Sequence, residues 1–341
     1  MMIRHSRWTV LLAVIGSFPA KAQVTDDAVQ RSVSKGLAYL ASEQATDGRW
    51  EADGGSYRVA MTSLAGMAFL MNGDTPTQGR YADRVDRAVR YILSQVQPTG
   101  LIGKPETDSR YMYGHGFAML FLSQIVGEDS DLQRRAEVMR VLEKAVLFCG
   151  QAQTSDGGWG YTTATEGFQF DEGSVTITQM QGLRSCRNAG VPVPKEIVAK
   201  GVKYIERCTT PTGVRYSLKT EGGARPPLSA AAVACLFNAG EYGHPSAMKL
   251  KTIADGHFSE GKSEGGILGH WHYAHYYYAQ VSYRDTPEKW KKYKQKVFRL
   301  ILDQQEANGA WTQGWVGPIY TTALNLAILQ LDGAALPIYQ R

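Results

Sequence analysis

Residues able to do chemistry are concentrated most densely between Gly269 and Tyr278, a stretch with three histidines and several tyrosines. His272 and His275 are three residues apart and can share one face of a helix, with His270 just before it. Three imidazoles could bind zinc and leave a fourth coordination position open. They could equally act as neutral bases beside the tyrosines. The alternative is structural, with imidazoles and phenols satisfying each other's hydrogen bonds inside the fold.

A second group of polar and aromatic residues precedes apolar helical runs. Arg110, Tyr113 and His115 stand at the entrance to one such run. Comparable positions before other runs hold Tyr57, Arg58, Arg225 and Tyr320. Aromatic rings mixed with Arg and His suit a sugar, a polar lipid or a peptide, and the sequence singles out none of them. The candidate ligand-binding residues are therefore Arg110, Tyr113, His115, Arg225, His270, His272, His275 and Tyr320.

The elements that must position these residues are marked by a repeated pattern, Gln-x-x-(Asp/Asn)-Gly-x-Trp. It occurs at residues 44–50, 153–159 and 305–311. Its glycine can take the positive φ that a tight turn requires. Three copies in one chain indicate a repeat protein. We assign structural roles to the Gln and Trp of each copy, namely Gln44, Trp50, Gln153, Trp159, Gln305 and Trp311.

Pairs of helical patterns recur at intervals of roughly fifty residues. The first member of each pair is amphipathic, beginning with a pattern from Val29 to Leu40 and followed by 80–96, 136–149, 194–208, 245–255 and 290–305. The second member is apolar on all sides, which is typical of a helix buried on all sides, at 61–71, 113–126, 175–189, 228–239, 273–283 and 321–331. The first and last of these buried helices are as apolar as the others, unlike the polar caps of an open solenoid. We therefore predict an all-α fold, a single closed (α/α)6 toroid with six outer and six inner helices.

The stretch from Lys35 to Trp50, with Gln44 and Gly48 in place, resembles the Q-W repeat of squalene and oxidosqualene cyclases. The closed toroid of six helix pairs is shared with the β subunits of protein prenyltransferases. The resemblance covers essentially the whole chain after its N-terminal segment. It implies that each Gln caps a neighbouring helix end and that each Trp packs over it.

The same resemblance bears on two acids. The cyclases protonate their substrate with an Asp-x-Asp-Asp motif before an inner helix, and Asp171 and Glu172 match its last two acids, whereas Gln169 replaces the first. Such an acid must be neutral and desolvated. Asp171 and Glu172 are therefore candidate catalytic residues. In the alternative they stabilise the dipole of the inner helix, and Asp171 lies near the cavity rim, ionised at neutral pH.

Metal and cofactor chemistry is not expected. Prenyltransferases hold zinc with an Asp-x-Cys pair and a later His. His275 falls where that His would be, but residues 230–235 offer no Asp-x-Cys pair. The four cysteines, Cys149, Cys186, Cys208 and Cys235, have no C-x-x-C spacing, and each lies in a helical pattern typical of a buried free thiol, although export would permit disulfides. We predict no metal and no cofactor.

The N-terminus indicates export. Arg4 and Arg7 form a basic start, residues 8–18 are apolar, and Ala20-Lys21-Ala22 fits a cleavage site, so we expect a signal peptide at 1–22 and a toroid domain at 23–341, periplasmic or extracellular. No later stretch approaches the ~20 apolar residues of a spanning helix. Loss of three basic residues with the signal lowers the formal charge of +5 towards neutrality, so nothing suggests a nucleic-acid partner.

Two functions remain open. The first is a binding module that holds an unidentified small molecule or protein in the central cavity or at its rim. The second is an enzyme that uses the cavity, either a divergent relative of the terpene cyclases with Asp171 as the acid, or a glycan enzyme using His and Tyr, like the sugar-acid lyases built on related helical toroids. The departures from both catalytic motifs favour the binding module.

Overall fold

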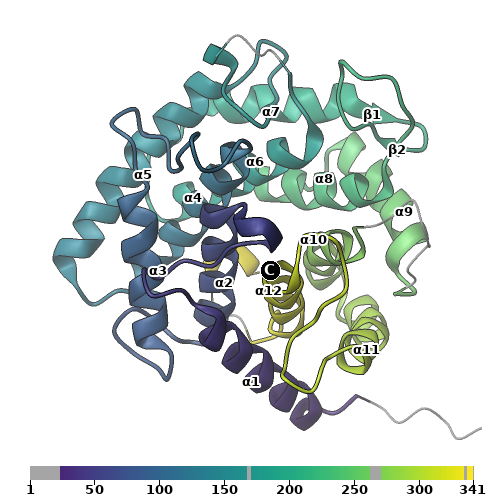
Figure 1. Cartoon of the computed structure of the whole chain (residues 1–341). Helices are drawn as coiled ribbons and strands as arrows, with labels where there is room; N and C mark the ends of the chain where they lie inside the picture. Colours follow the sequence, from purple (N-terminus) through teal and green to yellow (C-terminus); the bar gives the residue numbers. More distant parts are fainter. Residues whose placement is uncertain (1–23, 167–169, 262–269, 334–335, 341) are drawn as a thin grey trace, which may run out of the picture.

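The computed structural model describes residues 24–166, 170–261, 270–333 and 336–340. Within them, twelve α-helices alternate between an outer and an inner ring (Figure 1). The outer helices are α1 (Asp26–Glu43), α3 (Ala82–Ser94), α5 (Leu132–Ala152), α7 (Lys195–Cys208), α9 (Pro245–Phe258) and α11 (Pro287–Asp303). The inner helices are α2 (Arg58–Met71), α4 (Tyr111–Glu128), α6 (Gly173–Asn188), α8 (Pro226–Ala239), α10 (Trp271–Arg284) and α12 (Pro318–Leu329). Contacts of α12 with both α1 and α2 close the ring, which confirms the predicted toroid.

The signal peptide expected at residues 1–22 lies outside the described residues, as do Gln169 and Gly269. Short 3-10 turns occur at η1 (Asp53–Gly55), η2 (Ala164–Glu166) and η3 (Pro337–Tyr339). A small antiparallel hairpin, β1 (Thr209–Thr210) with β2 (Gly213–Val214), is an exception to the all-helical expectation. No helix in the described part of the chain is long and apolar enough to span a membrane.

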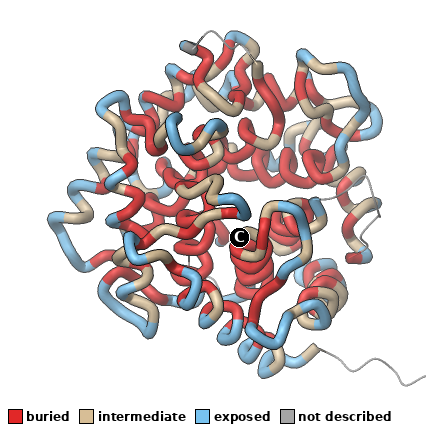
Figure 2. The backbone as a smooth tube through the Cα atoms, in the orientation of Figure 1, coloured by how far each residue is buried: buried red, intermediate tan, exposed pale blue. Residues whose placement is uncertain are grey.

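Burial separates the two rings as the sequence patterns predict. In the outer helix α3 the buried residues Val85, Ala88, Val89 and Ile92 follow the spacing of one helical face. In the inner helix α2 every residue after Arg58 is buried. Figure 2 shows this difference, with the buried backbone concentrated in the middle of the molecule and exposed loops around it.

Small residues allow the inner helices to approach each other closely. A Cβ atom added at Gly182 in α6 would lie 2.7 Å from the carbonyl oxygen of Gly116 in α4. One added at Gly66 in α2 would lie 2.5 Å from the ring of Phe121 in α4. Both distances are shorter than van der Waals contact, so larger residues there would push the helices apart.

Each Gln-Gly-Trp turn joins three parts of the ring. In the second copy, Trp159 is fully buried and its Nε1 donates to the carbonyl oxygen of Cys149 in the last turn of α5 at 2.8 Å. The side-chain amide of Gln153 donates to Gly157 O in its own turn at 2.8 Å and to Ile197 O in the first turn of α7 at 3.0 Å. Gly157 has φ +96°, and its backbone packs against Lys200, leaving no room for a Cβ.

The other two copies make the same contacts. Trp50 Nε1 donates to Leu40 O at 2.8 Å, and Trp311 Nε1 donates to Ile301 O at 2.7 Å. Gln44 reaches Arg84 O at the start of α3, at 3.0 Å. Gln305 reaches Ser32 O in α1 at 2.9 Å, which links the last outer helix to the first. Each turn therefore bonds to carbonyl groups of two neighbouring outer helices, through Trp to the last turn of the preceding helix and through Gln to the following one.

The C-terminal segment closes one end of the ring. Ile338 and Tyr339 are buried, and the Tyr339 hydroxyl lies 2.9 Å from the Tyr276 hydroxyl of α10. The end of the chain is seen at the middle of the ring in Figure 1. Nearby, Gln181 of α6 donates to Gln280 Oε1 of α10 at 3.3 Å, although α8 separates these helices in the ring. Side chains therefore fill the ring around Tyr276 and Gln280. A polar cluster lies at the opposite end, where the inner helices begin.

Candidate functional site

Five of the inner helices carry a polar side chain that holds the preceding turn, which we call the anchor residue. In α2, for example, the Thr62 hydroxyl accepts the backbone N–H of Trp50 at 3.0 Å. The anchors of α6, α8 and α12 accept equivalent backbone N–H groups and are Thr176, Ser229 and Thr322. In α4 the anchor is His115, whose Nδ1 accepts the N–H of Ile102 at 3.1 Å.

His115 is therefore not a rim residue. It is fully buried, and its Nε2 donates to Ala145 O of the outer helix α5 at 3.2 Å, so both ring nitrogens are engaged. Burial lowers the pKa of His115 to about 4, which keeps the imidazole neutral at physiological pH. The turn that it holds has Gly100 at φ +95° over Lys144 O, as in the repeated turns. It keeps only the glycine of the pattern, because Val96, Thr99 and Ile102 stand at the Gln, Asp and Trp positions.

The three histidines of α10 do not converge on one point. His275 lies five residues into its helix, as His115 does, and its Nδ1 lies 2.7 Å from the hydroxyl of Tyr293 on α11. His272 Nδ1 lies 3.0 Å from Asn325 Oδ1 on α12. His270 is exposed. No three His, Cys, Asp or Glu side chains of the described segments are grouped as metal ligands, so the three-histidine zinc site is wrong. The four cysteines are free and buried.

Two residues before the anchor position, three inner helices carry a tyrosine. These are Tyr113 in α4, Tyr273 in α10 and Tyr320 in α12, and we call them the tyrosine layer. Burial raises the pKa of Tyr273, and repulsion from Tyr277, Tyr113, Glu172 and Tyr320 adds to the effect. The hydroxyl groups of Tyr273 and of Tyr277, one turn further on, are buried without a hydrogen-bond partner among the described residues.

A carboxyl group joins this layer. Glu172 is fully buried at the N-cap of α6, where Oε1 accepts the N–H of Val175 at 2.6 Å and Oε2 accepts the N–H of Ser174 at 2.9 Å. The Tyr113 hydroxyl donates to Oε1 at 3.1 Å and lies 2.5 Å from the Ser174 hydroxyl. Burial raises the pKa of Glu172 even though these hydrogen bonds oppose the shift.

Asp171 points the other way, and the expectation that it lies at the rim is wrong. Its carboxylate is fully buried and accepts from Tyr204 of α7 at 2.8 Å, and from Thr154 and Ser217 at 3.2 Å each. Adjacent residues in extended backbone face opposite sides, and Glu172 has φ −150° and ψ 155°. The acid that faces the tyrosine layer is therefore Glu172, whereas Asp171 ties the outer helix to the turn.

Two cations lie near the same end of the inner helices. The guanidinium of Arg110, at the N-cap of α4, stacks over the Tyr161 ring at 4.5 Å, and its Nη1 donates to the Tyr57 hydroxyl at 3.2 Å. The hydroxyl of Tyr161 is also hydrogen-bonded to that of Tyr216. Arg225 is exposed at the N-cap of α8. Burial is the main cause of the lowered pKa of His270, and the positive charge of Arg225 is the second.

A small pocket opens at this end, which we call the mouth. It has a volume of about 10 Å³, room for a single water molecule, and is lined by His270, His272, Tyr273, Gly314, Trp315, Val316, Tyr320 and Thr321. Trp315 is 60% exposed, and its ring lies edge-on to His270 with centroids 5.8 Å apart. Sequence reasoning missed Trp315, Tyr161 and Tyr216, because they lie in loops outside the repeat.

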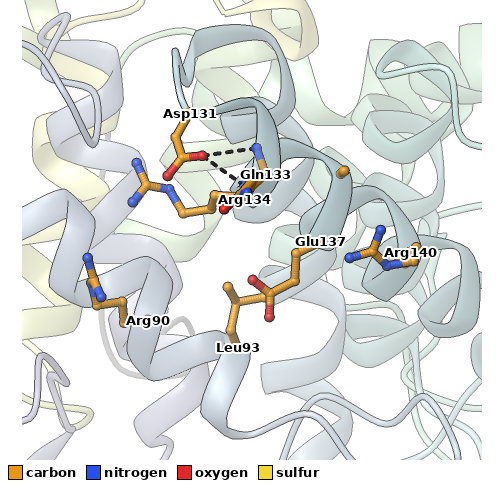
Figure 3. A pocket seen from close by; sticks show the side chains of 8 residues that line it. Arg90, Leu93, Asp131, Gln133, Arg134, Glu137 and Arg140 are labelled. Atoms are coloured by element: carbon orange, nitrogen blue, oxygen red, sulfur yellow. Dashed lines mark hydrogen bonds between the residues drawn. The ribbon is translucent and has the colours of Figure 1, made fainter.

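A larger hollow of about 520 Å³ lies outside the ring, between α3 and α5 (Figure 3). Its central cation, Arg134, is already paired with Asp86 at 2.6 Å and with Asp129. The lining has no aromatic side chain, and no buried polar atom of its lining residues lacks a partner. The mouth is therefore the better candidate site.

No protein-family model and no curated protein matches this sequence. Among solved structures, the type II terpene cyclase MstE from Scytonema with geranylgeranyl dihydroxybenzoate bound has a TM-score of 0.60 and 12% identity, covering 90% of this chain and 97% of that one. The GH76A α-1,6-mannanase from Salegentibacter has a TM-score of 0.63 and 8% identity, covering 89% and 98%. A protein from Actinoplanes has a TM-score of 0.56 and 15% identity, covering 88% and 98%. These likenesses show a shared α/α-toroid fold, common to proteins with different activities.

Proposed function

We propose that this protein binds a ring-shaped, hydroxyl-bearing ligand, of the kind a sugar presents, at the mouth of the toroid. The observation that carries the proposal is the exposed ring of Trp315, which lies edge-on to His270 in a pocket that Tyr320 also lines. An exposed indole beside polar side chains offers a flat apolar surface on which a ligand ring can stack. The apolar face of a sugar ring can stack on such an indole while its hydroxyl groups meet polar neighbours.

The polar neighbours at the mouth suit hydroxyl groups. His270 is exposed at one side, but partial burial of its ring and the nearby Arg225 lower its pKa, which favours a neutral imidazole with one donor and one acceptor. Tyr273 and Tyr320 line the same pocket, and the Tyr273 hydroxyl lacks a protein partner in the described segments. These neutral groups can form hydrogen bonds with the hydroxyl groups of a sugar, and they do not by themselves favour a charged ligand over a neutral one.

The size of the pocket favours a ligand held at the mouth over one enclosed in the ring. The pocket beside Trp315 has a volume of only about 10 Å³, which is too small to hold a long hydrocarbon chain. The buried C-terminal residues Ile338 and Tyr339 fill the other end of the ring. This is why we favour surface recognition of a sugar over cyclisation of a polyprene. Export through the signal peptide expected at 1–22 would place the protein where glycans are met, and we propose that as well.

Trp315→Ala should weaken sugar binding about tenfold, close to 1.4 kcal/mol, because it removes the stacking platform. Isothermal titration with a panel of oligosaccharides that includes α-1,6-mannotriose, the ligand of the mannanase neighbour, measures it. Leu147→Ala, at an equally exposed apolar residue on α5, is the matched control and should leave the affinity unchanged. Equal affinities for wild type and Trp315→Ala would place the sugar elsewhere.

A second candidate function is catalysis with Glu172 as the acid, in place of Asp171. It is supported by the burial and raised pKa of Glu172 and by its contact with Tyr113. A carboxyl group that holds its proton near neutral pH can serve as a general acid. Two of the structural neighbours are enzymes, one acting on a prenylated aromatic acid and one on an α-1,6-mannan.

The test of catalysis is turnover of α-1,6-mannan and of short polyprenes by wild type and by Glu172→Gln. If the protein is an enzyme, wild type forms product, and the Gln variant, which keeps the size of the side chain, loses at least a hundredfold in rate. Thermal unfolding of both proteins controls for folding. Absence of product from wild type on either substrate, or equal rates for both proteins, would reject Glu172 as the acid for these reactions.

A further inference from the structure

Arg110 is held at the mouth end of α4 by neutral aromatic groups. Its guanidinium lies over the face of Tyr161 at 4.5 Å and donates from Nη1 to the Tyr57 hydroxyl at 3.2 Å. It forms no salt bridge within the described segments. Arg58, by contrast, lies 3.3 Å from the carboxylate of Glu51 and donates to Gly55 O at 3.1 Å. The charge of Arg110 is therefore positioned but left without a carboxylate.

The neighbouring acid does not supply that partner. Asp108, two residues before Arg110, accepts the backbone N–H of Arg110 on Oδ1 at 3.0 Å. Burial raises the pKa of Asp108, which outweighs the opposite effect of the two nearby arginines. Among the described residues the Asp108 carboxylate forms no salt bridge with either arginine, and its Oδ2 has no hydrogen-bond partner. Asp108 thus shapes the loop before α4 and leaves the guanidinium available.

The residue that fixes Arg110 is strained. Tyr57 has φ +54° and ψ 37°, and no other residue except glycine has a positive φ in the described part of the chain. A left-handed conformation is unfavourable for a bulky residue, and such positions cluster at ligand sites. The strain places the Tyr57 ring edge-on to Tyr113 at 6.2 Å, with its hydroxyl under Arg110. The positioning of Arg110 is thus maintained at a cost in stability.

We infer that Arg110 binds a planar oxyanion on the ligand, a carboxylate or a phosphate, so that the sugar recognised at the mouth is an acidic one. This inference rests on the proposed sugar binding. A guanidinium has five N–H donors in a fixed fork, and one of those of Arg110 is used by Tyr57. The free edge matches the two oxygens of a carboxylate or phosphate. Stacking on Tyr161 fixes the plane of the fork before the ligand arrives.

The test compares each acidic probe with its neutral counterpart by isothermal titration. The carboxylate arm uses trigalacturonate and its methyl ester, and the phosphate arm uses α-1,6-mannotriose with and without a terminal phosphate. Wild type should prefer the acidic member of at least one pair about tenfold or more, and the preference should shrink as salt is raised. The pair that shows the preference identifies the oxyanion.

Arg110→Gln should abolish this preference while the affinity for the neutral counterpart stays within twofold. Arg110→Lys keeps the charge but loses the forked guanidinium, so its preference for the acidic member should fall between those of wild type and Arg110→Gln. If the Gln variant does not fold, the Lys variant provides the test. Arg140→Gln, at an exposed position on α5, is the matched control and should retain the full preference.

Two other outcomes separate this inference from the proposed function. Wild type that binds acidic and neutral members of both pairs equally would overturn the role of Arg110 and leave sugar binding intact. Wild type that binds no member of either pair, nor any sugar of the panel, would reject sugar binding itself and this inference with it. A preference that survives in Arg110→Gln would assign the oxyanion to another cation at the mouth and would also overturn the inference.

Discussion

Replacing Trp159 by alanine is expected to lower the free energy of unfolding by about 3–5 kcal/mol, the range for a large buried aromatic. The ring is fully buried, its Nε1 satisfies Cys149 O at the end of α5, and its backbone N–H is held by Thr176 of α6. Truncation leaves a cavity and an unpaired carbonyl at the junction of an outer and an inner helix. Urea denaturation monitored by circular dichroism measures the change.

The control for this prediction is another tryptophan. Trp315→Ala removes a ring that is 60% exposed, so it should change the free energy of unfolding by no more than about 0.5 kcal/mol. An unmoved denaturation midpoint for Trp159→Ala would contradict the structural role that we assign to the repeated turn. Trp50→Ala and Trp311→Ala should behave like Trp159→Ala, because both rings are buried and bonded in the same way.

The second large effect is expected at Asp171. Asp171→Ala should cost about 3 kcal/mol of stability, because three hydroxyl groups, those of Thr154, Tyr204 and Ser217, lose a buried acceptor. Asp156→Ala, at a partly exposed acid of the same turn that pairs with Arg207, should cost well under 1 kcal/mol. Denaturation of the two variants gives the comparison.

Asp171→Ala should leave sugar binding by the folded protein unchanged, since the side chain points away from the mouth. Titration at a temperature where the variant is folded tests this. A variant that kept its stability but lost its ligand would show that Asp171 belongs to the binding site. It would contradict the assignment of Glu172 as the acid that faces the site.

The ring of helices was predictable because a helix buried on all sides and a helix buried on one side have different hydrophobic patterns in the sequence. An inner helix is buried on every side, and α2 and α8 contain long runs of small and apolar residues with no charge after their first turn. The hairpin from Thr209 to Val214 was not predictable, because strands of two residues are too short to show alternation.

The site was predictable in part. Tyr113 and Tyr320 belong to the tyrosine layer, and Arg110 lies beside it, as their place before the inner helices indicated. His115 and His275 were misassigned, because a helix start does not reveal which face meets the outer ring. Asp171 and Glu172 face opposite sides because the backbone of Glu172 is extended, and the sequence does not reveal that local conformation. Trp315 could be recognised only once its exposure was known.

Native mass spectrometry of the protein purified without denaturation from its own host tests the central claim most directly. We predict that wild type carries a bound molecule with the mass of an acidic sugar, that Leu147→Ala carries it too, and that Trp315→Ala does not. The account would be contradicted by a bound molecule of another class, such as a polyprene, or by a sugar that Trp315→Ala retains in full.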